Sequence, residues 1–146
     1  MIQKYVDAWI ENKDKYEAWL RGLEYDWDVI DYETMVKQLI TLIINPCISS
    51  GYDGALQENK ITVIDDGDYQ GTQIFIIPYD VYQPDEEEYV YTHVGYGSCS
   101  GCDTLLNALS LSDYDEKLSG GTVDMLMVLA LHLIENFKPL APETEY

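Results

Sequence analysis

The chain has 146 residues, and its 27 Asp and Glu residues outnumber 8 Lys and Arg residues, which gives a formal net charge of -19. A surface this acidic repels nucleic acid and anionic membranes, so it argues against direct binding to either and favours basic partners. Hydrophobic residues make up 47% of the chain, which is enough for a core and is not typical of a disordered acidic tail. We expect a single domain over residues 1–146, with a frayed tail at 142–146.

Two helices are predicted near the start of the chain. In residues 2–22, apolar and aromatic residues recur at helical spacing, and Gly22 is a suitable stop. The second helix is predicted over residues 32–44, with Asp31 as its N-cap and the Asn-Pro pair at 45–46 as its end. Apolar residues nearly encircle this second segment, so we expect it to be well buried.

The apolar pattern changes to that of β-strands in the middle of the chain. Residues 60–65, 72–79 and 89–95 are rich in β-branched and aromatic residues. The short connections between them predict an antiparallel meander of three strands. Alternation in the third strand would place two sets of side chains on opposite faces, Tyr89, Tyr91 and His93 on one and Val90, Thr92 and Val94 on the other.

Two more helices are expected after the strands, a short one over residues 103–111 and a very apolar one over residues 122–137. Lys138 and Pro139 are predicted to end the last helix. The resulting order, ααβββαα, predicts an α+β fold. In this fold the helices pack on one face of the three-stranded antiparallel sheet.

Cys99 and Cys102 lie in a glycine- and serine-rich stretch between the third strand and the helix predicted after it. A thiol near a helix N-terminus has a lowered pKa, which would suit redox chemistry. Two cysteines at this spacing also supply half of a zinc site, for which Cys47, His93 and His132 are candidate further ligands. We favour a tight turn in which the cysteines are small buried groups, and we expect no cofactor, with zinc as the alternative.

The sequence favours a cytoplasmic protein. The N-terminal residues carry charges throughout and do not resemble a signal peptide, and the longest apolar run, 125–131, is too short to span a bilayer. Three cysteines, an odd number, suit a reducing compartment better than a disulfide framework. If a phage encodes the protein, the compartment would be the host cytoplasm.

Acidic residues and tyrosines are interleaved in the predicted connections. Tyrosine combines a flat apolar face with a hydroxyl and suits interfaces, and the chain has 13 tyrosines against two phenylalanines. Carboxylates spaced over a rigid fold can imitate duplex DNA, which carries one negative charge per about 1.7 Å. The candidate phosphate surrogates are Asp26, Asp28, Asp66, Asp68, Asp85, Glu86, Glu87 and Glu88, and the candidate packing anchors are Tyr25, Tyr69 and Tyr82.

Residues 91–109, YTHVGYGSCSGCDTLLNAL, are similar to segments of small acidic accessory proteins of bacteriophages. The resemblance is confined to this segment and implies no catalytic role. It implies an accessory protein of a phage or mobile element, a class whose acidic members include anti-restriction and anti-CRISPR nucleic-acid mimics.

We therefore expect a non-enzymatic inhibitor that binds the basic nucleic-acid-binding groove of a host defence protein. The expected partner is this basic host protein, with no direct contact to nucleic acid or membrane. Two alternatives stay open. One is a small protein with a structural metal or redox site at Cys99 and Cys102, and the other is a generic interaction module whose acidity serves solubility.

Overall fold

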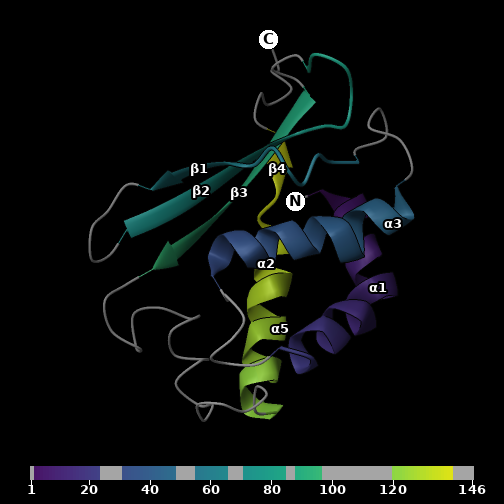
Figure 1. The fold of residues 1–146 in the computed structure, drawn as a ribbon, viewed down its shortest axis with the longest axis vertical. Helices are drawn as coiled ribbons and strands as arrows, with labels where there is room; N and C mark the ends of the chain where they lie inside the picture. Colours follow the sequence, from purple (N-terminus) through teal and green to yellow (C-terminus); the bar gives the residue numbers. More distant parts are fainter. Residues whose placement is uncertain are drawn as a thin grey trace.

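The computed structural model describes residues 2–23, 31–48, 55–65, 71–84, 88–96 and 120–139. Figure 1 shows the arrangement of their helices and strands. The helices are α1 (Gln3–Arg21), α2 (Tyr32–Gln38), the π-helix η1 (Leu39–Ile44), α3 (Asn45–Cys47) and α5 (Gly120–Glu135). The strands are β1 (Thr62–Asp65), β2 (Gly71–Pro78), β3 (Tyr89–Tyr96) and β4 (Lys138–Pro139).

The α+β class is confirmed, but the predicted number of strands is wrong. Within the described ranges, the antiparallel sheet has four strands in the order β1-β2-β3-β4. Lys138 and Pro139 follow the last helix and also form a strand, β4. They run antiparallel to β3 and pair with Tyr91 and Val90. A two-residue strand leaves no periodic pattern in the sequence, which is why β4 was not predicted. The predicted helix over 103–111 and the tail at 142–146 lie outside the described residues.

One face of the sheet contributes to the hydrophobic core. Phe75 and Ile77 of β2 lie opposite Thr92 and Val90 of β3, and all four side chains are buried. The described helices lie on one side of the sheet in Figure 1. The predicted alternation along β3 is confirmed, because the tyrosine and histidine side chains within 89–93 are only partly buried.

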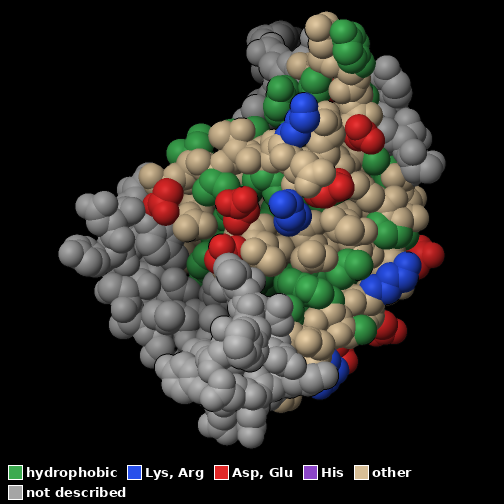
Figure 2. All heavy atoms as spheres, in the orientation of Figure 1, with side chains coloured by type: hydrophobic (Ala, Val, Ile, Leu, Met, Phe, Trp, Pro, Cys, Tyr) green, Lys and Arg blue, Asp and Glu red, His purple; other side chains and the backbone are tan. Residues whose placement is uncertain are grey.

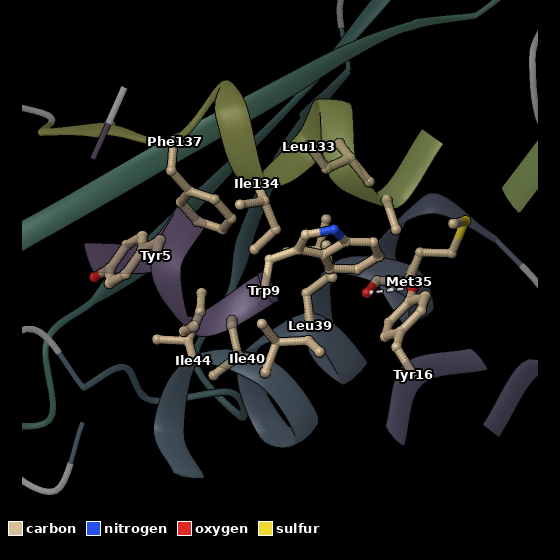
Figure 3. Close-up of a cluster of buried hydrophobic side chains, with 14 of the residues drawn as sticks. Tyr5, Trp9, Tyr16, Met35, Leu39, Ile40, Ile44, Leu133, Ile134 and Phe137 are labelled. Atoms are coloured by element: carbon tan, nitrogen blue, oxygen red, sulfur yellow. Dashed lines mark hydrogen bonds between the residues drawn. The ribbon is translucent and has the colours of Figure 1, made fainter. Parts of the chain in front are cut away.

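The core lies where α1, the α2–η1 segment, α5 and the sheet meet, and Figure 3 shows part of it. Tyr5 of α1 packs edge-to-face on Phe137, with ring centroids 5.5 Å apart. Tyr16 is fully buried, and its hydroxyl donates a hydrogen bond of 3.1 Å to the carbonyl oxygen of Met35. The predicted burial of the second helix is confirmed by its six fully buried side chains, Met35, Val36, Leu39, Ile40, Ile43 and Ile44.

Only the first part of the second predicted helix, α2, is α-helical. The rest of it, η1, is a π-helix, a conformation that is rare in proteins. Asn12 of α1 is buried and donates from Nδ2 to the carbonyl oxygen of Ile43 at 3.1 Å. The helical path also continues through Pro46 to Cys47, beyond the predicted end, since the fixed φ of proline is compatible with a helix, and the path ends at the residue after it.

The remaining predicted boundaries agree closely with the structure. The helix predicted over 2–22 is α1, and the helix predicted over 122–137 is α5, displaced by two residues towards the N-terminus. Asp31 caps α2 as predicted, because its side chain accepts a hydrogen bond of 2.7 Å from the Thr34 amide. None of the helices in the described ranges is long and apolar enough to cross a membrane.

Candidate partner-binding surface

The negative charge of the chain is unevenly divided between the described ranges and the remaining segments. The described ranges hold 12 of the 27 acidic residues and 7 of the 8 basic residues. The other 15 acidic residues, with one basic residue, belong to the sequence outside these ranges. On the face drawn in Figure 2, the described acidic side chains are separated from one another and mixed with Lys and Arg. The described surface is therefore only moderately acidic.

Few of the predicted partner-binding residues can be placed. Glu88 directly precedes β3, and Tyr82 lies in the connection between β2 and β3. The other predicted site residues lie outside the described residues, namely Asp26, Asp28, Asp66, Asp68, Asp85, Glu86, Glu87, Tyr25 and Tyr69.

Backbone hydrogen bonds anchor the β2–β3 connection at one end of the sheet. The Tyr79 amide donates to the carbonyl oxygen of Glu88 at 2.7 Å, which extends the antiparallel ladder. The Asp80 amide donates to the carbonyl oxygen of Ala55 at 2.9 Å, and the Gln57 side chain donates to that of Tyr79 at 2.9 Å. The start of the connection is therefore fixed to the segment that precedes β1.

Tyr82 projects from this anchored connection. Its relative exposure of 88% is the largest among the exposed large hydrophobic residues in the described ranges. The next residue, Gln83, has a φ of 50°, in the left-handed region that residues other than glycine seldom adopt. Strained backbone of this kind clusters at functional sites. The connection therefore presents an exposed aromatic ring directly before the acidic residues at 85–88.

A polar hollow of about 400 Å³ lies beside the connection. Asp80, Glu58 and Lys60 line it, so its charged groups are two carboxylates and one ammonium. Asn45 also lines the hollow, and both polar atoms of its side-chain amide form hydrogen bonds. Its Nδ2 donates to the carbonyl oxygen of Leu56 at 2.9 Å, and its Oδ1 accepts from the Leu56 amide at 3.0 Å. No sequence pattern indicated this hollow, because its residues come from separate segments.

Glu88 influences a neighbouring tyrosine through its charge. Burial raises the pKa of the Tyr79 hydroxyl, and the negative charge of Glu88 raises this pKa further. Tyr79 therefore stays neutral at physiological pH, and the only charge that this pair presents is the Glu88 carboxylate.

Two of the described candidates for a metal site, Cys47 and His93, have different surroundings. Cys47 of α3 lies against α1, where its sulfur accepts a hydrogen bond from Asn12 at 2.9 Å and donates one to Glu11 at 3.5 Å. His93 lies on β3, and its carbonyl oxygen accepts a hydrogen bond of 3.5 Å from Asn136. Within the described ranges, no group of three or more His, Cys, Asp or Glu residues is placed to hold a metal ion. Cys99 and Cys102 lie outside the described residues, so the interpretations of their loop stay predictions.

Comparison of the chain with protein-family models, with curated proteins and with solved structures found no match. Its function is therefore inferred from the charges and contacts of its own residues.

Proposed function

We propose that this protein is a non-enzymatic inhibitor of the anti-CRISPR and anti-restriction type, which binds the basic nucleic-acid-binding groove of a host defence protein as a DNA mimic. The observation that carries the proposal is the division of charge along the chain. Of the 27 acidic residues, 15 lie in the stretches 24–33, 65–68, 85–88 and 113–116, none of which contains Lys or Arg. Carboxylates concentrated in this way attract the lysines and arginines of a nucleic-acid site.

The sheet gives two of the acidic segments widely separated attachment points. Asp65 precedes segment 66–70 at one end of the sheet, and Glu88 follows segment 85–87 at the other. Between these ends runs β2, which has eight residues. Asp65 pairs with Gln73, and Glu88 bonds to Tyr79 six residues further along, so a rise of about 3.4 Å per residue separates the attachment points by about 20 Å. The same distance along one DNA strand carries about six phosphates, which matches the scale of a nucleic-acid groove.

Tyr82 would supply apolar contact next to the charged segment. A largely exposed tyrosine ring removes a large apolar area from water when it is covered, and tyrosines are common among the residues that dominate binding energy. The hydrogen bonds that anchor Tyr79 and Asp80 limit the conformational entropy that this part of the connection would lose on binding.

Capture from a bacterial lysate at low salt, followed by elution at high salt, would identify the partner. We expect a basic nucleic-acid-binding protein whose capture is blocked by added duplex DNA. The variant Asp85→Asn/Glu86→Gln/Glu87→Gln should then weaken binding to the purified partner by about tenfold or more.

The matched control removes three exposed carboxylates from α1 and α5, in the variant Asp14→Asn/Asp124→Asn/Glu135→Gln. It should weaken binding by no more than about threefold, because these charges are not part of the proposed contact. Equal losses in the two variants would mean that net charge alone matters, as expected for the generic acidic module. Capture that DNA does not block, or that depends on Cys99 and Cys102, would contradict the proposal.

A further inference from the structure

We propose that the exposed edge of β1 binds an extended, basic segment of the partner as an additional β-strand. The basic charge of the partner rests on the proposed function. The mode of binding, by an added strand, is inferred from the geometry of the sheet. Strand addition of this kind uses main-chain hydrogen bonds for affinity and side-chain contacts for specificity.

β1 is the outer strand of the sheet, on the side opposite to β4 (Figure 1). In the described ranges, β2 is the one strand that pairs with it. All four of its residues are exposed. In an antiparallel edge strand, alternate residues direct their N–H and C=O groups away from the neighbouring strand, where an added strand can bond to them.

β1 exposes one apolar side chain on each of its two faces. Val63 and Ile64 have relative exposures of 37% and 44%, and as successive residues they point to opposite faces. Covering either face would remove apolar surface from water, which stabilises a complex by about 25 cal/mol per Å². An added strand would cover part of both side chains at once.

The opposite edge of the sheet lacks these properties. β4 has only two residues, and one of them, Pro139, has no amide N–H to donate. The other, Lys138, is exposed and charged, and lysine at a sheet edge discourages pairing with another strand. β1 has neither a proline nor a lysine, so it has the properties of an edge that can accept a strand.

The charges around β1 select a basic occupant. Asp65 ends the strand, and Asp66 and Asp68 follow it in the sequence, whereas Lys60 precedes it. A segment with lysines or arginines near the Asp65 end would therefore be favoured. A second copy of this chain is disfavoured, because it would bring together two molecules that each carry a net charge of -19.

Two peptides distinguish strand addition from attraction by charge alone. The first alternates lysine and valine, and the second has the same sequence with N-methyl groups on its central amides, which removes the donors on both peptide edges. Binding of the full chain is measured by fluorescence anisotropy at fixed ionic strength. We expect the methylated peptide to bind about tenfold more weakly, because main-chain bonds are lost. Equal affinities would overturn the proposal.

A pair of variants tests whether the contact involves β1. Val63→Thr/Ile64→Thr keeps β-branched residues in the strand but removes apolar surface, and should weaken binding of the unmethylated peptide several-fold. Val128→Thr/Ile10→Thr makes the same exchanges at exposed helix positions with exposures of 53% and 64%, and should leave peptide affinity unchanged. Equal effects of the two variants would contradict the contact.

Failure of the proposed function and failure of strand addition give different experimental results. If Asp85→Asn/Glu86→Gln/Glu87→Gln weakens partner binding but both peptides bind equally, the proposed function stands and strand addition is wrong. If the peptides differ as expected but this variant binds the partner normally, the proposed function is wrong. Self-association of the chain that Val63→Thr/Ile64→Thr abolishes would assign the edge to a second copy and overturn the proposal.

Discussion

The hydroxyl of Thr92 donates a buried hydrogen bond of 2.8 Å to the carbonyl oxygen of Leu133, which joins β3 to the last turn of α5. Carbonyl groups in the last turn of a helix lack partners within the helix, so this bond satisfies a group that burial would otherwise penalise. Thr92→Val keeps the side-chain shape but removes the donor, and should lower the free energy of unfolding by about 1–3 kcal/mol. Urea denaturation measures the loss. The exposed Thr41→Val serves as control, and an equally small effect in both variants would contradict the role of Thr92.

A second hydrogen bond links α1 to the π-helix. Asn12 donates from Nδ2 to the carbonyl oxygen of Ile43 at 3.1 Å, within the core. Asn12→Leu leaves this carbonyl group without its side-chain donor, so we expect a loss of about 1–3 kcal/mol in the free energy of unfolding. The neighbouring exposed Lys13→Leu should change it by less than about 0.5 kcal/mol. Stability unaffected by Asn12→Leu would show that η1 does not depend on this contact.

Alkaline pH should destabilise the protein. Burial raises the pKa of Tyr16 well above its ordinary value of 10.0, and burial also raises the pKa of Tyr5. In the unfolded chain these hydroxyls ionise near pH 10, whereas in the folded chain they stay protonated. The contribution of these two tyrosines to stability is therefore complete below about pH 10. Above that pH, the free energy of unfolding falls as pH rises.

Tyr16→Phe removes one of these ionisations and should make that fall with pH shallower. The measurement is urea denaturation at a series of alkaline pH values, with tyrosinate absorbance recorded in parallel. Tyr82→Phe, at an exposed position, should leave the slope as it is in the unmodified chain. The same slope in all three proteins would contradict the coupling between burial and ionisation of Tyr16.

The Cys47 thiol should react slowly with alkylating reagents at neutral pH. Desolvation raises its pKa, and a hydrogen bond to Glu11 raises the pKa further. Because the thiolate is the reactive form, Glu11→Gln should speed alkylation several-fold. The rate is measured by mass spectrometry in a Cys99→Ser/Cys102→Ser background, in which Cys47 is the remaining thiol. Glu17→Gln is the control, and equal rates in both variants would exclude an influence of Glu11.

Long periodic segments were predicted well because a single pattern extends over many residues. The apolar spacing of α1 and the alternation of β3 each repeat several times, and burial in the structure follows them. β4 could not be predicted, since its two residues acquire strand geometry only by pairing with Val90 and Tyr91. The π-helix was not predicted because the segment's own side chains are apolar on nearly all sides of the helix. A local change in helical period therefore leaves the apolar pattern unchanged.

In the candidate surface, too, features set by local sequence could be predicted, and features set by tertiary packing could not. The exposed position of Tyr82 follows from a connection rich in tyrosine, proline and carboxylates, which local sequence reveals. The hollow lined by Asn45, Leu56 and Asp80 could not be predicted, because tertiary packing brings those three residues together. The exposed edge of β1 likewise depends on strand order, which the sequence of β1 alone does not specify.

The salt dependence of partner binding is the most direct test that carboxylates of this chain occupy a basic nucleic-acid groove. The dissociation constant of the purified partner is measured at increasing salt concentration, for the unmodified chain and for Asp85→Asn/Glu86→Gln/Glu87→Gln. We expect affinity to fall steeply with salt for the unmodified chain and less steeply for the triple variant, because the variant has three fewer carboxylates for salt to screen. Tight binding that does not change with ionic strength would contradict the proposed function.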